Sequence, residues 1–351
     1  MKSNKIIKNE PFVSIIIINF NGGDIIHECI NSIYETVMNR FEIILIDNKS
    51  SDNSSTKCKK KWPEIKLIQN NENIGLTARN IGIKESEGEF IVFLDSDTVV
   101  TNGWLENLIQ SFKENGDGLY QPKLLEKKRP DVINSAGNMI NILGMGFSRG
   151  KGKKDEGQYE KFQEIGYTSG ACTFTSTKII KKIGNINKIF FSYHDDLDYG
   201  WRGWLQKIPS YYEPKSKIYH LGSPTLKWSA KKFYFLERNR WICLFYLYST
   251  STIIKIFPIL FFLEIGIFFY FLTKGNGKEK LRALISIFKL RKQIIQNKNR
   301  INKNRVISDK EVIKHFVNNF EIPTNFKESS SLFTNNIIKK CSNIARRLIK
   351  T

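Results

Sequence analysis

The stretch Phe90-Ile91-Val92-Phe93-Leu94-Asp95-Ser96-Asp97 decides how this chain folds. Its first five residues form a continuous apolar run, typical of a strand buried on both faces of a parallel sheet. The two aspartates follow at the carboxyl end of that strand, where open α/β sheets bind their ligands. Their oxygens would suit Mg²⁺ or Mn²⁺ that carries a phosphate-bearing substrate. The alternative for such a pair, taken alone, is a solvated acidic turn.

The segments before this stretch repeat its design. Apolar runs at residues 12–20, 42–47 and 65–69 indicate further strands, and the segments between them have turn residues and helical spacing. Strands that alternate with helices predict an α/β fold with parallel βαβ units and right-handed crossovers. We therefore expect Asp47, the 73–79 loop and the two aspartates at 95 and 97 to meet at one edge of the sheet.

Four segments of this half resemble the successive motifs of family 2 glycosyltransferases. They are SIIIINFN at residues 14–21, IDNKSSD at 46–52, NIGLTARNIG at 73–82 and FLDSD at 93–97. The resemblance continues through Gly170-Ala171-Cys172 and Asp195-Asp196 to about Arg240, and it is greatest for the rhamnosyltransferase-like branch that builds polysaccharides and lipid-linked glycans. It implies the GT-A fold, with a Rossmann-like, mostly parallel central sheet flanked by helices, and a nucleotide-sugar donor.

The resemblance also implies which residues contact the donor. It places Asp47 at the base of the sugar nucleotide and Asp95 nearer the ribose and sugar. Two alternatives remain open, a turn-capping role for Asp47 and a solvated helix position for Arg79. The full set of implied donor-binding residues is Asn19, Asp47, Asn73, Gly75, Arg79, Asp95 and Ser96.

A divalent cation, Mn²⁺ or Mg²⁺, is the cofactor that the resemblance implies. Asp97 matches the aspartate that holds the cation most directly. His220 follows a predicted strand at 217–219 and matches a histidine that reaches the metal or the diphosphate, and histidine is a common metal ligand. The alternative for His220 is a structural role. The cation would neutralise negative charge that develops on the departing diphosphate.

The segment FFSYHDDLDYGWR at residues 190–202 carries the rest of the expected chemistry. An acceptor hydroxyl must lose a proton as it attacks, and the resemblance makes Asp196 the base that takes it. Asp195 stands where the family usually has glutamate, so its carboxylate has a shorter reach. A single displacement of this kind inverts the anomeric centre. The remaining residues are expected on the acceptor side or in structural support: His194, and the pair Asp198 and Arg202 at i,i+4 spacing.

Composition restricts the partners and the compartment. The chain has 351 residues with 55 basic and 34 acidic side chains, a net charge of +21, which indicates an anionic partner. No nucleic-acid-binding motif is recognised, so anionic lipid or a polyphosphate substrate is the expected partner. The five cysteines are scattered without zinc or disulfide spacing, which fits a reducing cytoplasm. The lysine-rich residues 1–10 do not resemble a signal peptide.

The C-terminal third suggests a membrane. Residues 253–272 are apolar and long enough to cross a bilayer, but Glu264 would be costly inside one and Pro258 would kink the helix. A basic amphipathic helix follows, and both flanks are basic, so we expect an in-plane or re-entrant helix pair on the cytoplasmic face of the cell membrane. A buried appendage or a homodimer interface is the alternative. A predicted helix at 228–248 contains Glu-Arg-Asn-Arg at 237–240, either for phosphate binding or as a solvated face.

The sequence thus predicts three regions: a catalytic domain at 1–228, a helical region at 229–298 and a basic tail at 299–351. The predicted activity is inverting transfer of a sugar to a hydroxyl of a membrane-associated, polyprenyl-linked glycan. A polyprenyl-phosphate hexose synthase is the alternative enzyme, and a catalytically silent scaffold on the same fold is the alternative of another class.

Overall fold

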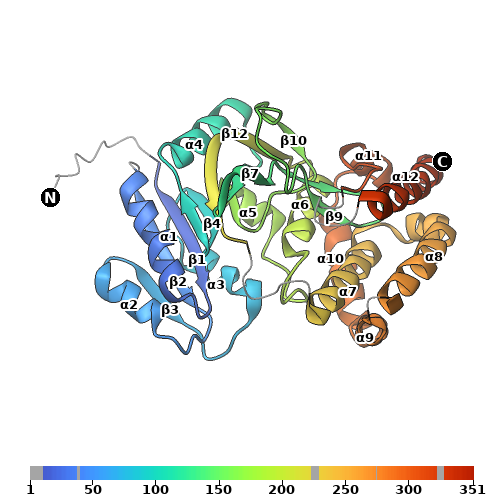
Figure 1. Cartoon of the computed structure of the whole chain (residues 1–351), viewed down its shortest axis with the longest axis horizontal. Helices are drawn as coiled ribbons and strands as arrows, with labels where there is room; N and C mark the ends of the chain where they lie inside the picture. Colours follow the sequence, from blue (N-terminus) through green and yellow to red (C-terminus); the bar gives the residue numbers. More distant parts are fainter. Residues whose placement is uncertain (1–10, 38–39, 223–228, 274, 322–327) are drawn as a thin grey trace.

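The computed structural model describes residues 11–37, 40–222, 229–273, 275–321 and 328–351. The predictions made for residues 1–10 and for Trp228 lie outside this part of the chain. A ten-stranded sheet forms the centre, in the order β10-β12-β6-β11-β4-β1-β2-β3, with β5 paired to β12 and β7 to β6. Figure 1 shows the N-terminal helices along one side of this sheet and the helices of residues 230–350 gathered at the opposite end of the molecule.

The N-terminal half is the parallel part of the sheet. Its strands are β1 (Val13–Asn19), β2 (Phe41–Asp47), β3 (Lys66–Gln69) and β4 (Phe90–Asp95), and they pair in parallel in the order β3-β2-β1-β4. The helices between them are α1 (Gly23–Thr36), α2 (Ser54–Lys61), the 3₁₀ turn η1 (Gly75–Ala78) and α3 (Arg79–Glu85). Asn19 lies opposite Asp47, and Ile18 opposite Asp95. These polar strand ends therefore share one edge of the sheet, as predicted.

Burial on both faces explains the apolar run Ile15–Ile18 in β1. Successive side chains of a strand point to opposite faces. Ile15 and Ile17 pack in a cluster with Ile26 and Ile30 of α1, whereas Ile16 packs in a second cluster on the other face of the sheet, with residues of η1 and α3. Helices on both faces thus favour apolar residues along the strand, and the buried Ser14 is satisfied by Glu42 and by the N–H of Gly88.

The second half makes the sheet mixed. β11 (Cys172–Ser176) lies antiparallel between β4 and β6 (Leu119–Glu126), because Cys172 enters the sheet opposite Leu94, at the edge where β4 ends. The Rossmann-like α/β class is confirmed, with the parallel order limited to β3-β2-β1-β4 and to β6-β12. The other elements of this half are β5 (Thr98–Val100), α4 (Trp104–Asn115), β7 (Arg129–Ser135), β8 (Asn138–Ile140), β9 (Gly146–Ser148), β10 (Gln163–Ile165), α5 (Thr177–Ile183), α6 (Asp195–Leu205) and β12 (Ser210–His220).

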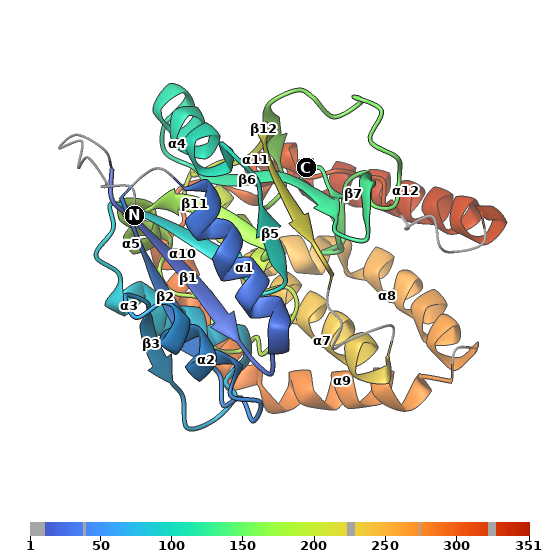
Figure 2. The ribbon, with the colours of Figure 1, turned by 60° about the vertical axis from the view of Figure 1, so that its left-hand side comes forward.

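The C-terminal helices share a core with the sheet domain. The cluster that contains Leu244 of α7, Leu260 of α8 and Ile349 of α12 also contains Ile140 and Trp201 of the preceding domain. Figure 2 shows α8 between α9 and α12. The elements are α7 (Ala230–Leu247), α8 (Thr250–Thr273), α9 (Gly277–Lys289), α10 (Arg291–Asn304), α11 (Asp309–Val312), η2 (Ile313–His315) and α12 (Glu328–Lys350).

Candidate active site

Sheet pairing brings a histidine to the aspartate pair. β5 follows Asp97 and pairs antiparallel with β12, so Thr98 lies opposite His220. His220 Nε2 is 3.3 Å from Asp97 Oδ1. Asp95, Asp97 and His220 each offer one ligand atom, and these three atoms lie within 4.8 Å of one another. The two carboxylates suit Mg²⁺ or Mn²⁺, and imidazole is a common ligand for divalent metals, so this donor set fits a divalent cation.

Asn134 orients the imidazole and was not identified from the sequence. Its Oδ1 lies 3.1 Å from His220 Nδ1, so Nδ1–H can donate to it while Nε2 faces Asp97. Burial opposes protonation of His220, but the neighbouring Asp97 outweighs burial and raises the pKa of the imidazole. No sequence motif marks Asn134, because its role depends on the register of β7 beside β6 and β12.

Arg79 links the aspartate pair at the end of β4 to the segment that carries Asp195. Its guanidinium lies 2.8 Å from Asp95 and 3.3 Å from Asp195, and it donates to the carbonyl of Gly170 at 2.7 Å. The side chain is 3% exposed, so the solvated-helix alternative for Arg79 is wrong. Arg79 therefore fixes Asp95 and Asp195 relative to each other, and its own bond to Asp195 spans 116 residues of sequence.

Asp196 lies beside this pair with both carboxyl oxygens engaged. Its Oδ2 accepts from the N–H of Gly170 at 3.1 Å and its Oδ1 from the N–H of Leu197 at 2.8 Å. Burial, with Asp195 as the next cause, raises the pKa of Asp196 to about 7. Burial likewise raises the pKa of Asp95 and of Asp195 to about 6, against the opposing effect of Arg79. Carboxyl groups with raised pKa values at one cleft are typical of functional sites.

On the expected donor side, Asn19 and Asp47 are buried in hydrogen bonds to a neighbouring turn. Asn19 Nδ2 donates to Ser54 and Ser55 at 2.8 and 2.7 Å, and Asp47 accepts from the Ser55 hydroxyl at 2.6 Å and the Ser50 N–H at 3.1 Å. These bonds match the capping alternative for Asp47. Contact of either residue with a donor stays a prediction.

The loop at 73–75 abuts the segment that carries Asp195. Asn73 Oδ1 accepts from the N–H of Gly75 at 2.9 Å and from Asn48 at 3.0 Å. Gly75 has φ +64°, and a Cβ there would lie 2.0 Å from the carbonyl oxygen of Phe191. Glycine is therefore required for close approach of the two loops. Ser96, between the two aspartates, is half-buried.

Asp198 and Arg202 support the site from within. Both are fully buried; Arg202 Nε donates to Asp198 at 3.0 Å, and its two terminal nitrogens donate to the carbonyls of Ile183 and Asn185. Of the two roles left open for this pair, these contacts match structural support. His194 precedes α6 with φ +61°, and burial lowers the pKa of its ring to about 3, so it is neutral at physiological pH.

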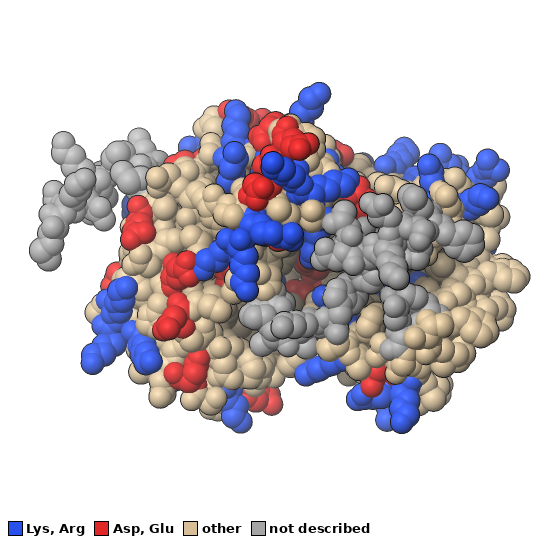
Figure 3. All heavy atoms as spheres, viewed as in Figure 1, with Lys and Arg blue, Asp and Glu red and all other residues tan. Residues whose placement is uncertain are grey.

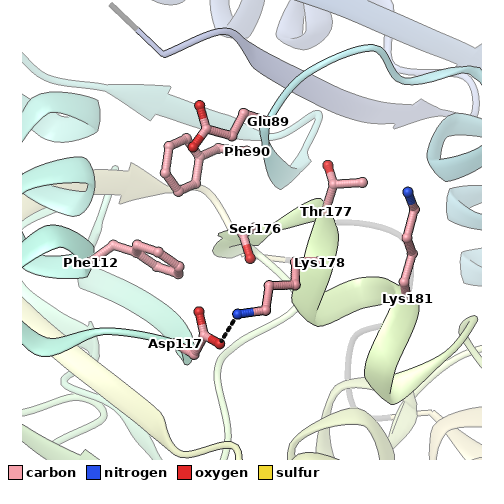
Figure 4. Close-up of a pocket in the computed structure, with 8 residues that line it drawn as sticks. All are labelled: Glu89, Phe90, Phe112, Asp117, Ser176, Thr177, Lys178 and Lys181. Atoms are coloured by element: carbon pink, nitrogen blue, oxygen red, sulfur yellow. Dashed lines mark hydrogen bonds and ion pairs between the residues drawn. The ribbon is translucent and has the colours of Figure 1, made fainter.

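The carboxylate cluster and a second hollow lie at opposite ends of strand β4. Figure 3 shows acidic atoms at the bottom of a central hollow with lysine and arginine atoms above it. The second hollow, of about 520 Å³, is lined by residues that include Phe90, Phe112, Asp117 and Lys178 (Figure 4). Phe90 begins β4, whereas Asp95 ends it. The second hollow is therefore remote from the carboxylate cluster.

Comparison with known families bears on this site. The family model described as "Glycosyl transferase family 2" matches residues 14–184. The match includes the Asp95–Asp97 stretch and Arg79 and ends before Asp195. The comparison thus covers three of the charged groups of the site, Arg79, Asp95 and Asp97, and it agrees with the resemblance seen in the motifs.

Curated relatives are glycosyltransferases. The chain is 32% identical to "Poly(ribitol-phosphate) beta-N-acetylglucosaminyltransferase TarP" of Staphylococcus aureus over 38% of this chain and 48% of that protein. It is 34% identical to "Poly(ribitol-phosphate) beta-glucosyltransferase" of Bacillus spizizenii over 32% of this chain and 19% of that protein. The chain thus spans half or less of the length of these relatives.

Two solved structures share the fold. "Crystal structure of GalNAc-T7 with UDP, GalNAc and Mn2+" superposes with a TM-score of 0.58 at 14% identity, over 72% of this chain and 51% of that chain. "Mannosyltransferase PcManGT from Pyrobaculum calidifontis in complex with GDP-Man and Mn2+" gives a TM-score of 0.51 at 13% identity, over 96% and 87%. At these identities the likeness establishes the GT-A architecture alone.

Proposed function

Because residues 14–184 form a family 2 glycosyltransferase domain with the GT-A fold, we propose that the protein transfers a sugar, with inversion, from a nucleotide-sugar donor to a hydroxyl of a membrane-associated glycan. The observation that carries the proposal is the meeting of the Asp95–Asp97–His220 group with Asp196 across Arg79. Solved neighbours of the same fold that hold a nucleotide or nucleotide sugar with Mn²⁺ support the donor class.

Asp97, Asp95 and His220 are the residues that would hold the cation, Mn²⁺ or Mg²⁺, together with the donor diphosphate. Bound there, the cation supplies electrostatic stabilisation of the leaving diphosphate. Asn134 keeps the Nε2 of His220 available, and Arg79 keeps Asp95 in place. Burial raises the pKa of Asp95 to about 6, while Arg79 opposes this rise and the neighbouring Asp97 adds to it.

Asp196 is the group that would take the acceptor proton. The N–H groups of Gly170 and Leu197 fix its carboxyl orientation, and each oxygen retains lone-pair capacity for a hydroxyl proton. A pKa raised to about 7 suits a base that works near neutral pH. Asp195 faces Arg79 instead, which leaves it a supporting role beside Asp196.

The acceptor class is proposed from the names of relatives and from the charge of the chain. The names of two relatives give poly(ribitol-phosphate) as their acceptor, which supports a polymeric glycan or polyol-phosphate acceptor for this chain. The net charge of +21 also favours an anionic one. Of these classes we favour a polyprenyl-linked glycan, because the C-terminal helices present an apolar surface that suits a membrane.

This surface, here called the outer face, consists of exposed apolar side chains of α8 and α9. Phe262 and Phe269 of α8 are 69% and 60% exposed, and Phe288 of α9 is 68% exposed. Exposed Arg282, Lys289 and Lys292 flank them on α9 and α10. An apolar patch bordered by basic groups fits an anionic bilayer surface. The other members are Ile254, Phe257, Phe261, Ile265, Phe268, Leu272, Leu281, Leu284 and Ile285.

For α8 we favour a position in the plane of the membrane over a span. By length and composition it is the one described helix that could cross a bilayer, and 24% of its most apolar window is buried. Its inner residues Ile256 and Leu260 are fully buried in the core that includes Trp201. Glu264 bonds Arg240 and Lys280. A span would break both sets of contacts. On this proposal residues 1–228 catalyse, and 229–298 dock the protein at the cytoplasmic membrane face beside the 299–351 tail.

A donor screen tests the catalytic proposal. Purified protein is offered nucleotide sugars with Mn²⁺ or Mg²⁺, and transfer to lipid-linked glycans, polyol-phosphate polymers and polyprenyl phosphate is measured. We expect metal-dependent transfer, abolished in Asp97→Ala together with metal-dependent donor binding. Transfer only to polyprenyl phosphate would establish the alternative synthase. Donor binding with no transfer to any acceptor would favour the scaffold.

Flotation with vesicles tests the docking proposal. We expect the protein to float with vesicles that contain anionic lipid and less with neutral ones. Phe262→Glu should abolish flotation, whereas Val306→Glu, at a residue 61% exposed outside the outer face, should not. A stable dimer in solution that Phe262→Glu dissociates would instead assign the outer face to a homodimer.

A further inference from the structure

Helix α7 buries the four residues Glu-Arg-Asn-Arg at 237–240. A solvated face, one of the two roles expected for them, is therefore wrong. Their polar atoms bond to other parts of the protein instead. Glu237 and Arg240 face α8 and α9, whereas Arg238 and Asn239 face the segment that leads into Asp195. Arg238 and Asn239 thus contact the segment that leads into the proposed active site.

Asn239 holds two carbonyl groups of that segment. Its side chain is fully buried, and its Nδ2 donates to the carbonyls of Ser192 at 2.9 Å and Tyr193 at 2.8 Å. Arg238 donates from Nε to Asn239 Oδ1 at 2.8 Å, which fixes the amide so that its NH₂ faces the two carbonyls. Arg238 also donates to the carbonyl of Ile189 at 3.2 Å.

The segment needs this support because its backbone is unfavourable. Tyr193 and His194 have φ of 63° and 61°, a left-handed pair without glycine. Residues with a Cβ rarely adopt this conformation twice in succession. The pair reverses the chain so that α6 begins at Asp195 and the carboxyl group of Asp196 reaches the N–H of Gly170.

The same segment is also held from the donor side. The N–H of Leu76 donates to the carbonyl of Phe191 at 3.1 Å, and the Phe191 ring stacks on Phe235 of α7 at 6.0 Å. The segment thus lies between the 73–79 loop and α7. Of these supports, those from α7 are the ones that reach Ser192 and Tyr193, just before His194 and Asp195.

We propose that Asn239, oriented by Arg238, is a positioning residue for Asp196, an inference that rests on the proposed transferase function. Without the amide NH₂, the part-buried carbonyls of Ser192 and Tyr193 lose their donors and the left-handed turn relaxes. The carboxyl group of Asp196 then leaves its place beside Gly170. A displacement near 1 Å of a catalytic group lowers turnover by about 100-fold.

Asn239→Asp tests this role because it keeps the side-chain volume and removes both N–H donors. We expect kcat to fall by about 100-fold, while the Kd for the nucleotide with Mn²⁺ changes by less than about twofold. Arg238→Lys keeps the charge and removes the Nε donor, and we expect it to lower kcat less. Both are assayed well below their melting temperatures.

Asn141→Asp is the matched control. Asn141 is also fully buried, and its Nδ2 donates to two carbonyls, of Asn318 at 3.0 Å and Asn319 at 3.1 Å, away from the carboxylate cluster. We expect it to lower stability but to keep wild-type kcat. Wild-type kcat in Asn239→Asp, or an equal loss in both variants, would overturn the positioning role.

Amide hydrogen exchange supplies a readout that does not depend on activity. Residues 189–198 should exchange faster in Asn239→Asp than in the wild type and remain unchanged in Asn141→Asp. Unchanged exchange in Asn239→Asp contradicts the positioning role. A wild-type protein that transfers no sugar overturns the proposed function alone, because the exchange result stands without it.

Discussion

Two clusters of charged residues in this protein are built on opposite plans. At the sheet edge, Asp95, Asp97, Asp195 and Asp196 meet a single guanidinium, that of Arg79, and burial raises the pKa of three of these carboxyl groups. Between the C-terminal helices, Glu237 and Glu264 meet Arg240 and Lys280, two charges of each sign. We call these the open cluster and the closed cluster.

The charge balance and the exposure of each cluster determine its role. The open cluster sets four carboxyl groups against the Arg79 guanidinium and the His220 imidazole, so we expect an added cation to stabilise it. The closed cluster is neutral and nearly sealed, with three of its side chains 3–5% exposed and Glu264 17% exposed. Removing any one member of a buried, balanced network is strongly destabilising, because the remaining charges are left unpaired. The open cluster is suited to binding and the closed one to holding α7, α8 and α9 together.

The substitution with the largest expected effect removes the proposed base of the open cluster. Asp196→Asn keeps the side-chain size and removes the proton acceptor. We expect kcat to fall by about 10²–10⁴-fold, as for loss of a general base, with donor affinity retained. Steady-state transfer kinetics and donor titration measure the two quantities. Near-normal turnover would exclude Asp196 as the base.

The next largest effect is expected when a charge is removed from the closed cluster. Glu264→Ala leaves Arg240 and Lys280 short of a partner, and we expect a loss of about 3–5 kcal/mol in the free energy of unfolding. The double variant Glu264→Leu with Lys280→Met removes one charge of each sign and should lose less, since Glu237 and Arg240 remain paired. Denaturant unfolding measures both. Equal losses in the two variants would mean that packing, not charge balance, holds the helices.

Addition of Mn²⁺ distinguishes the two clusters by thermal stability, without an activity assay. Mn²⁺ at 100 times its Kd should stabilise the wild type by about 2.7 kcal/mol and raise its Tm. The gain should vanish in Asp97→Ala and persist in Glu264→Ala, because only the open cluster lacks cationic charge. Thermal unfolding with and without Mn²⁺ is the measurement. A gain that survives Asp97→Ala would move the cation site elsewhere.

The smallest effect comes from a charge pair of neither cluster. Lys178 and Asp117, 3.0 Å apart at the hollow of Figure 4, are 77% and 46% exposed. Exposed ion pairs contribute about 0–1 kcal/mol. Lys178→Ala should therefore change stability by less than about 1 kcal/mol and leave transfer unaltered. A large loss of transfer would show that this hollow takes part in the reaction.

The sequence located the open cluster in part. Asp95 and Asp97 were predicted at a sheet edge because the apolar run before them has strand length and a carboxyl end. Asn134 and the bridging position of Arg79 were missed because neither has a local signature. Asp198 and Arg202 were recognised as a pair from i,i+4 spacing, but only their complete burial distinguishes support from acceptor contact.

The closed cluster was outside the reach of sequence reasoning. Glu264 looked like an isolated acid in an apolar helix, and the 237–240 motif looked like a basic group for phosphate or solvent. Their partners come from three separate helices, so no periodicity could connect them. The sequence predicts an apolar helix at 253–272, but which of its residues face the core follows only from packing against α12 and α7.

The sequence by itself determined the strands, their shared edge and the family of the first half, because these depend on apolar runs, turn residues and short motifs within a few tens of residues. The tertiary structure alone decided that Asn134 holds His220 beside Asp97, that Arg79 joins Asp95 to Asp195 and that α7 supports the segment before Asp196. Such contacts join distant parts of the chain. They arise from strand register and helix packing, which act only once the whole core has formed.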